Sequence, residues 1–281
     1  MGDRREINRE IFEDTELQCK KHPLLAKVVK EAIQKQKIYL ETESVVSLKE
    51  KKHGRTEIVV SAKRSFEAAK AYRDKKVCVH NFASATNPGG GVTRGSSAQE
   101  ECLCRCSTLY FNLVAQACWD KFYAPHRAMH YPVYNDDCIY TPDVVVFKSD
   151  TDYPIVLPES EWYKVNVLTC AAPNLRAIPS NSMNPNAGKK PVKMKNSELL
   201  ELHLKRNRRI LDIAAANGNE VVILGAFGCG AFQNPPEVVA ESYKQLVKEY
   251  DGVFETIEFA VYCPEHDRRN YEVFCRILGE A

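Results

Sequence analysis

The chain has 281 residues, and its 39 Lys and Arg residues against 37 Asp and Glu residues give a formal net charge of +2. This near-balance gives no bulk electrostatic attraction to a nucleic acid or an acidic membrane, so we expect no membrane and no sequence-specific nucleic acid among the partners. In addition, no apolar run reaches the roughly 20 residues that a membrane-spanning helix needs. The eleven cysteines are an odd number in a chain too large to need disulfides, which indicates reduced thiols and a cytoplasmic protein.

The first part of the chain predicts a helical extension. Apolar residues at helical spacing indicate helices over 5–20 and 23–39. A charged stretch over 49–55 then separates these helices from the rest of the chain. We therefore expect two parts, an N-terminal helical extension (residues 1–55) that packs on the core and a main domain (residues 56–281).

In the main domain, short apolar strands alternate with helices. The expected strands cover residues 58–60, 77–82, 165–170, 221–224 and 257–262, with paired strands over 136–147 around Thr141 and Pro142. The expected helices cover residues 65–72, 99–117, 196–216, 235–250 and 271–278, and a long polar loop covers 173–195. This alternation is typical of an α/β domain with a largely parallel or mixed central sheet.

A glycine-rich loop follows the strand over 77–82. Gly89, Gly90 and Gly91 stand between the end of that strand and a helix that begins at the acidic cluster over 99–101. Glycines allow a backbone to approach a ligand closely and to turn its N–H groups inward. The pattern favours an anion-binding loop, and a plain flexible connection is the alternative.

A second glycine-rich loop, residues 225–234, lies between the strand over 221–224 and the start of the next helix. Exposed N–H groups and the positive end of a helix dipole suit an anion. The glycines also match a weak dinucleotide fingerprint, but too few strand–helix pairs follow them for the usual nucleotide-binding half. Two such loops at strand ends of one sheet predict a cleft that holds a pyrophosphate from both sides.

The order of these motifs resembles the poly(ADP-ribose) glycohydrolase family. The three glycines, a seven-residue spacer over 92–98 and the triplet Gln99, Glu100 and Glu101 match the signature of that family. Further segments resemble its microbial-type branch: 81–84, 103–109, 140–143, 168–174 and 225–232. The resemblance spans the chain from near residue 56 to the C-terminus. It implies a macrodomain-like fold, a three-layer α/β/α sandwich with a mixed central sheet that binds ADP-ribose.

The resemblance also implies roles for individual residues. Glu101 would be the general acid and base, Glu100 would hold ribose hydroxyls, and Gln99 would orient the turn. Asn87 would contact the distal ribose near the reacting carbon, and Phe232 would pack against that ribose. The diphosphate would lie between two sets of loop residues, with Gly89, Gly90, Gly91 and Val92 on one side and Gly228, Cys229, Gly230 and Ala231 on the other.

For two residues, the sequence allows two different roles. Asn81 is either a ligand contact or a hydrogen-bonding residue that closes the loop. Tyr262, at the end of the last expected strand, either stacks on adenine or belongs to the core. The residue types alone do not decide between these interpretations.

Proton transfer is expected from one carboxyl group. Glu100 and Glu101 are neighbours on a helix, so their side chains diverge by about 100° and do not face each other across a bond as in two-carboxylate glycosidases. A helix N-terminus should lower a carboxyl pKa, whereas burial beside a bound diphosphate raises it. We expect substrate binding to bring Glu101 to its acid form. Acidic residues in a first helical turn are also common merely because the dipole favours them.

Other motifs give weaker signals. Cys102, Cys104 and Cys106 resemble a metal cluster, but packing as small buried apolar residues explains them better. A Cys–His nucleophilic dyad with Cys229 stays open, because the sequence identifies no partner histidine. The lysines over 189–195 form either a solvated loop or a rim that attracts a polyanion.

The sequence thus predicts a microbial-type poly(ADP-ribose) glycohydrolase that cleaves ribose–ribose O-glycosidic bonds, releases ADP-ribose and needs no cofactor or metal. Its expected partner is poly(ADP-ribose) or an ADP-ribosylated macromolecule. The alternatives are a hydrolase that removes single ADP-ribose groups from protein or nucleic acid, and an ADP-ribose-binding reader without turnover. A reader needs no acid, so Glu101 argues against it.

Overall fold

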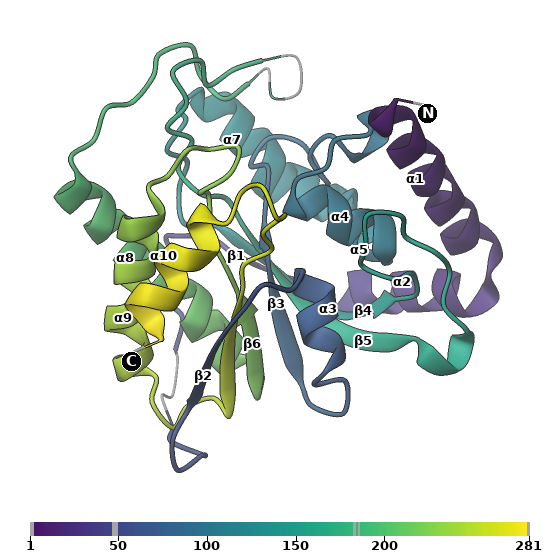
Figure 1. Ribbon diagram of the computed structural model, residues 1–281. Coiled ribbons are helices and arrows are strands. Elements are labelled where there is room, and N and C mark those ends of the chain that lie inside the picture. The colour runs from purple at the N-terminus through teal and green to yellow at the C-terminus, as the bar shows by residue number, and fades with distance from the viewer. Residues whose placement is uncertain (1–2, 47–49, 182–183, 185, 280–281) are drawn as a thin grey trace.

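A seven-stranded mixed sheet organises the computed structural model, which describes residues 3–46, 50–181, 184 and 186–279 (Figure 1). From one edge to the other, the strands are β1 (Lys37–Tyr39), β4 (Cys138–Val146), β5 (Tyr163–Cys170), β3 (Val77–Phe82), β6 (Val221–Leu224), β7 (Thr256–Ala260) and β2 (Glu57–Ser61). The last five of these strands are parallel to one another, and β4 is antiparallel to both β1 and β5. The carboxyl ends of the five parallel strands therefore meet at one edge of the sheet.

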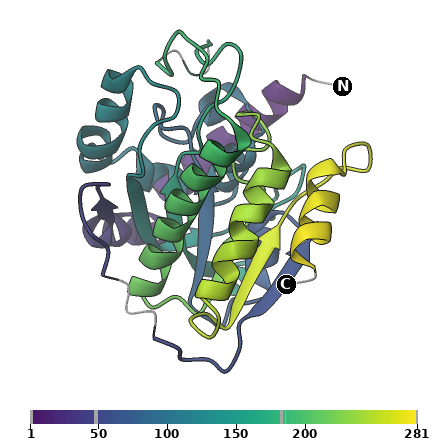
Figure 2. The same cartoon turned by 90° about the vertical axis from the view of Figure 1, so that its left-hand side faces the viewer.

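Helices cover both faces of the sheet. Figure 2 shows α8 (Asn196–Ala216), α9 (Pro236–Glu249) and α10 (Arg269–Leu278) side by side over one face. The opposite face carries α3 (Ser65–Lys70), α4 (Gln99–Cys106) and α5 (Leu109–Leu113), and α1 (Arg4–Lys21) packs against α4. The remaining elements are α2 (Pro23–Lys35), α6 (Gln116–Cys118), α7 (Ala124–Met129) and the turns η1 (Val92–Arg94), η2 (Trp119–Tyr123) and η3 (Glu159–Glu161). The predicted three-layer α/β/α sandwich is confirmed.

The central strands show why this sequence forms a sheet with two covered faces. Val77 and Val79 of β3 belong to the core on the side of α3 and α4, whereas Cys78 belongs to the core under α8 and α9. Strands covered on both faces need near-continuous apolar sequences, and every residue of β6 is buried. Among the described residues, no helix combines the length and the apolar character that crossing a membrane requires.

The helix predicted over 99–117 is wrong beyond Cys106. α4 ends there because Ser107 is extended and forms an antiparallel bridge with Val146 of β4. The Thr108 hydroxyl then accepts a hydrogen bond from a backbone amide of β4 at 3.1 Å. Such bonds offer the backbone an alternative to the helix. Several short helical segments, from α5 to α7, take the place of one long helix.

Two further predictions differ from the structure around β4. The helix predicted over 23–39 stops before its end, and residues 37–39 form β1, which pairs with β4. The strands predicted over 136–147 are one strand with a bulge, not a pair. The bulge contains Pro142, which cannot donate a ladder hydrogen bond, and Asp143 with a φ of 56°. Both differences depend on pairing between distant segments.

The N-terminal extension packs along the main domain. One face of α1 is buried and consists of Asn8, Phe12, Thr15 and Cys19. The ring of Phe12 meets Tyr110 edge-on with 4.9 Å between the centroids, and β1 extends the sheet. We propose that the extension (residues 1–55) and the main domain (residues 56–281) unfold as one cooperative unit.

Phe12→Ala should lower the free energy of unfolding by about 3–5 kcal/mol, because the substitution removes a buried aromatic side chain and leaves a cavity. Urea unfolding followed by circular dichroism and by tryptophan fluorescence measures this, and both probes should report one transition. Leu17→Ala, at a position 46% exposed on the same helix, is the matched control and should change the value by less than about 0.5 kcal/mol. Two separate transitions would show that the extension folds apart from the main domain.

Candidate active site

A cavity of about 930 Å³ opens at the carboxyl edge of the sheet. Its walls include residues that closely follow β3, β5, β6 and β7: Ala83, Ser84, Ala172, Ala226, Val261 and Tyr262. β3 lies between β5 and β6, so the strand order reverses at its carboxyl end. In open α/β sheets such a reversal leaves a crevice in which ligands bind.

Both glycine-rich loops line this cavity. The first contributes Gly90 and Gly91, and the second contributes Gly228, Gly230, Ala231 and Phe232. Gly228 has a φ of 77°, and a Cβ atom there would lie 2.6 Å from side-chain atoms of both Ala172 and Asn234. A larger residue therefore does not fit at this position. The structure brings together the two loops that the sequence predicts to face each other.

Two buried carboxyl groups lie beside the first loop, and both line the cavity. Glu100 accepts hydrogen bonds from the Ser84 amide at 2.7 Å and from Asn81 Nδ2 at 3.3 Å. Glu101 accepts the Gly91 amide N–H at 2.8 Å through Oε1. Its Oε2 is buried and has no hydrogen-bond partner among the described residues. Glu101 therefore keeps one oxygen for a proton and a ligand.

Gly90 lies close to both carboxyl groups. Its φ is 60°, and a Cβ atom there would be 2.4 Å from Glu101 Oε1 and 3.1 Å from Glu100 Oε2. The two side chains leave the helix in different directions, yet both reach this one backbone position. A glycine is required here because any side chain would displace the carboxyl group of Glu101.

Burial raises the pKa of both carboxyl groups. For Glu100, burial and then the neighbouring Glu101 raise the pKa, while hydrogen bonds from Ser84 and Asn81 lower it. For Glu101, burial raises the pKa, and the Gly91 N–H is the largest opposing effect. Burial thus outweighs the lowering expected at a helix N-terminus. The pKa of Glu101 is raised without a bound diphosphate, so its acid form does not depend on substrate alone.

Gln99 and Asn81 hold the backbone around the carboxyl groups. The side chain of Gln99 accepts from the Phe82 amide at 2.9 Å. It donates to the His80 carbonyl at 2.8 Å and to the Ser65 hydroxyl at 3.0 Å. These bonds tie β3 and α3 to the start of α4. Asn81 is fully buried and does not line the cavity, which fits the loop-closing interpretation better. A ligand contact by Gln99 stays a prediction.

Besides Asn81, four predicted contact residues do not line the cavity: Asn87, Gly89, Val92 and Cys229. The side chain of Asn87 accepts a hydrogen bond from the Arg127 guanidinium at 2.7 Å. Gly89 packs against Tyr110, whose ring is 2.7 Å from the place of a Cβ atom. These contacts shape the first loop from outside, and a direct ligand contact stays a prediction for all four residues.

Of the cysteines near the site, Cys104 and Cys106 are buried, and Cys102 and Cys229 are partly buried. Burial raises the pKa of Cys102, Cys104, Cys106 and Cys229. A thiol that keeps its proton is a poor nucleophile and a poor metal ligand. The dyad left open for Cys229 is therefore disfavoured. In the described part of the chain, no three His, Cys, Asp or Glu side chains gather as ligands of a metal ion would.

Sequence reasoning missed a set of polar residues that also line the cavity: Arg4, Arg5, Arg64, Asp150, Asp152, Arg176, Asn181, Asn184 and Asn270. Such isolated residues carry no motif, and the length of the loop over 173–195 is the one signal that points to some of them. Tyr262 lies beyond the end of β7 and is 46% exposed. The Arg64 guanidinium lies 3.9 Å above its ring. Tyr262 is therefore not a core residue, and its stacking on adenine stays a prediction.

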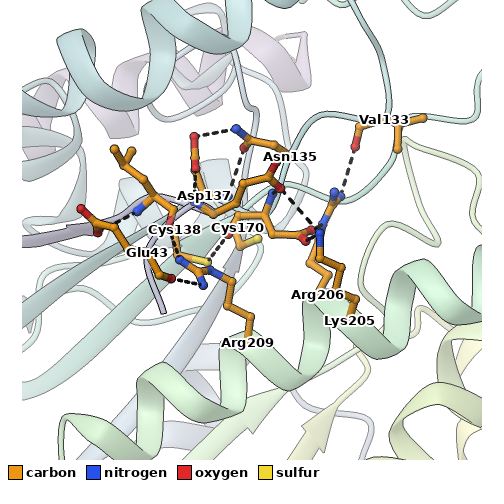
Figure 3. Close-up of polar contacts among 12 residues, drawn as sticks. Glu43, Val133, Asn135, Asp137, Cys138, Cys170, Lys205, Arg206 and Arg209 are labelled. Atoms are coloured by element: carbon orange, nitrogen blue, oxygen red, sulfur yellow. Dashed lines mark hydrogen bonds and ion pairs between the residues drawn. The ribbon is translucent and has the colours of Figure 1, made fainter. Parts of the chain in front are cut away.

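A buried ion pair braces one wall of the cavity (Figure 3). Arg206 of α8 donates to Asp136 Oδ1 at 2.7 Å and to the Ala171 carbonyl at 2.8 Å. Lys205, which Figure 3 shows beside Arg206, pairs with Asp136 at 2.7 Å. Although burial acts to raise it, the two cations hold the pKa of Asp136 below its ordinary value. The brace fixes Ala171, and the next residue, Ala172, lines the cavity.

Comparison with known proteins identifies relatives of this fold and site. A family model described as microbial-type PARG, catalytic domain, matches residues 9–149. Poly(ADP-ribose) glycohydrolase from Thermomonospora curvata is 30% identical, with a TM-score of 0.79, over 96% of this chain and 99% of that chain. A structure of that protein bound to the inhibitor ADP-HPD is 31% identical, with a TM-score of 0.79, over 96% of this chain and 98% of that chain.

A poly(ADP-ribose) glycohydrolase from Deinococcus radiodurans in complex with ADP-ribose is 31% identical, with a TM-score of 0.76, over 90% of this chain and 97% of that chain. No match is found among curated proteins. The mixed sheet between helical layers is macrodomain-like, and the cavity belongs to a hydrolase of glycosidic bonds. The chain is a member of the microbial-type poly(ADP-ribose) glycohydrolase family.

Gly90→Ala should reduce kcat for poly(ADP-ribose) roughly 100-fold, because the new methyl group displaces the carboxyl group of Glu101. The left-handed backbone conformation adds a cost in stability of about 1–2 kcal/mol. Gly230→Ala is the matched comparison, since a Cβ atom at residue 230 meets no atom within 4 Å, and it should keep the parental melting temperature. Turnover assays and thermal unfolding measure these effects. Full activity of Gly90→Ala would contradict the position given to the acid.

Glu100→Gln should weaken the pH dependence of stability. The pKa of Glu100 in the folded protein is raised above its ordinary value of 4.5. At pH values between the ordinary pKa and the raised pKa, the folded protein therefore binds more protons than the unfolded chain. Parental stability therefore falls as pH rises through this window, and the variant, which does not ionise, should be more stable at neutral pH.

Chemical unfolding between about pH 5 and pH 8 measures this difference. Glu10→Gln, at an exposed position of α1, should keep the parental dependence on pH. If parent and Glu100→Gln had parallel stability curves over this range, the raised pKa of Glu100 would be wrong.

Proposed function

We propose that this chain cleaves the ribose–ribose O-glycosidic bonds of poly(ADP-ribose) and releases ADP-ribose, with Glu101 as general acid and base. Membership of the family supports the reaction, and structures of relatives are in complex with ADP-ribose and ADP-HPD. The cavity volume of about 930 Å³ suits a ligand of this size. The observation that carries the role of Glu101 is its buried Oε2, which has no partner among the described residues.

The hydrogen bonding of Glu101 determines which oxygen holds its proton. Oε1 accepts the Gly91 N–H and so acts as the carbonyl-like oxygen. Burial raises the pKa of Glu101, which favours the protonated group. We assign the proton of the acid form to Oε2, which has no hydrogen-bond partner among the described residues. A glycosidic oxygen within hydrogen-bond reach of Oε2 can receive this proton directly.

Cleavage at C1″ of the bound ribose breaks the C–O bond, and the electron pair leaves with the oxygen of the neighbouring ribose. The Oε2 proton of Glu101 forms the new O–H bond on that oxygen. The bound ribose then has oxocarbenium character, and water adds to C1″ while it gives a proton to the Glu101 carboxylate. The group returns to its acid form, so one carboxyl group is sufficient.

Several other predicted contacts are compatible with this proposal. Glu100 accepts hydrogen bonds from the Asn81 side chain at one oxygen and from the Ser84 amide at the other, and carboxylate oxygens also accept hydrogen bonds from ribose hydroxyls. Backbone N–H groups of the second loop, next to the N-terminus of α9, suit the diphosphate. Phe232 belongs to the same loop, lines the cavity and would pack on the distal ribose. Tyr262 would lie against the adenine.

A reader without turnover is disfavoured by the same acid. Diphosphate binding uses backbone N–H groups and needs no carboxyl group beside them. A buried polar atom without a partner costs about 1–3 kcal/mol. Glu101 Oε2 is such an atom, and a binding module gains nothing from it, whereas a general acid requires it.

Glu101→Gln should reduce kcat on poly(ADP-ribose) by roughly 100-fold to 10,000-fold, because the amide cannot donate the proton. ADP-ribose should still bind with an affinity within about threefold of the parent, since the loops keep their N–H groups. Release of free ADP-ribose and isothermal titration calorimetry measure the two effects.

Glu10→Gln makes the same chemical change at an exposed position and should behave as the parent in both assays. Parental turnover by Glu101→Gln would exclude this residue as the acid. A parent that binds ADP-ribose but does not act on poly(ADP-ribose) would instead indicate a reader, or an enzyme for single ADP-ribose groups.

A further inference from the structure

Three arginines from separate segments line the cavity: Arg4 and Arg5 from α1, and Arg64 from the loop after β2. Arg4 and Arg64 pair with the same oxygen, Oδ1 of Asp152, and the distance for Arg4 is 3.6 Å. Arg5 forms no ion pair with any residue that the structure describes. One carboxylate therefore neutralises two guanidinium groups in part, and the third guanidinium group has no anionic partner within the described ranges of the chain.

The other carboxyl group on this wall, Asp150, does not restore the balance. One of its oxygens accepts the Phe66 amide N–H at 3.0 Å. Together with Asp152 it places two carboxyl groups against the three guanidinium groups on this side of the cavity. The wall formed by Arg4, Arg5 and Arg64 therefore has an excess of positive charge.

Contacts with the loop around Gly95 hold the backbone of the first turn of α1, which carries Arg4 and Arg5, in place. Asn8 is buried and donates to the Gly95 carbonyl at 3.0 Å. A Cβ atom on Gly95 would lie 2.0 Å from the Arg5 carbonyl oxygen, so the first turn of α1 rests directly on the spacer between the glycines and the acid. Figure 1 shows α1 alongside α4, the helix that carries Glu101. The first turn of α1 is thus part of the rim of the cavity.

This inference rests on the substrate proposed above, poly(ADP-ribose), whose diphosphates could balance the positive charge of the three arginines. The loops can hold the diphosphate of one unit with N–H groups, but the next unit of the polymer carries its own diphosphate outside the cavity. Guanidinium groups bind phosphate oxygens in a bidentate manner. We propose that Arg4, Arg5 and Arg64 form a subsite for the diphosphate of the polymer unit next to the one in the cavity.

A rival location for polymer binding is the lysine-rich loop. Lys189, Lys190 and Lys193 are exposed, and they do not line the cavity. Flexible, solvated lysines attract any polyanion, whereas Arg4 and Arg64 converge from two segments on Asp152 and Arg5 lines the same cavity. The arginine subsite therefore predicts a preference for polymer over single units that the lysines do not.

The test uses the full chain with the double substitution Arg4→Ala/Arg5→Ala. Steady-state kinetics are compared on poly(ADP-ribose) and on ADP-ribose linked at C1″ to a small phenol, which has no second unit. The ratio of the polymer KM to the single-unit KM should rise roughly threefold to tenfold. The slope of log KM for polymer against log salt concentration should fall by about two, one for each lost phosphate contact. Lys20→Ala/Lys21→Ala, at the other end of α1, removes the same charge and should change neither quantity.

Each other outcome overturns the subsite. An equal effect on both substrates would show that the first turn of α1 only supports the fold of the site. A larger effect from the triple substitution of Lys189, Lys190 and Lys193 by Ala would move polymer binding to the lysine loop. Competition by duplex DNA as strong as that by polymer of equal phosphate concentration would reduce the arginines to a general polyanion surface. If the parent cleaves neither substrate, the proposed function fails as well, and this result is distinct from all the others.

Discussion

The close approach of Gly90 to the carboxyl group of Glu101 is the constraint on which this site depends. A carboxyl group removed from water needs hydrogen bonds from the protein, and the first loop gives Glu101 one from the Gly91 N–H. The loop can come so near because Gly90 has no side chain and a left-handed backbone. This one contact positions the proposed acid, leaves Oε2 as the oxygen without a partner among the described residues and fixes the loop beside it.

Buried polar side chains outside the cavity extend the same principle to the second loop. Asn234 donates to the carbonyls of Pro173 at 2.7 Å and Gly228 at 3.1 Å, and it bonds to the His203 ring at 2.9 Å. Burial lowers the pKa of His203 to about 4, so the neutral ring keeps an N–H for this bond at pH 7. Because a buried bond left unmade costs about 1–3 kcal/mol, such contacts restrain the loops more strongly than surface turns could.

The sheet and the two loops could be predicted because local sequence determines them: the apolar run of β6 suits a covered strand, and glycines mark the close approaches. The early end of α4 could not be predicted from local sequence, because Ser107 leaves the helix to pair with Val146, which lies far along the chain. The residues of the site likewise fall into those that the sequence predicts and those that it does not. Glu101 and the glycines belong to a motif, whereas Arg4 and Arg64 reach the cavity only through folding and have no sequence signal.

A single carboxyl group must be an acid before bond cleavage and a base after it, and the surroundings of Glu101 suit both states. Burial favours the acid form. After the proton has left, the Gly91 N–H and the N-terminal turn of α4 stabilise the carboxylate. These opposing effects hold its pKa between that of a surface carboxyl group and that of a buried one without hydrogen bonds. General acid–base catalysis needs a group that both donates and accepts a proton, and this combination of burial and hydrogen bonding is what the proposed double role of Glu101 requires.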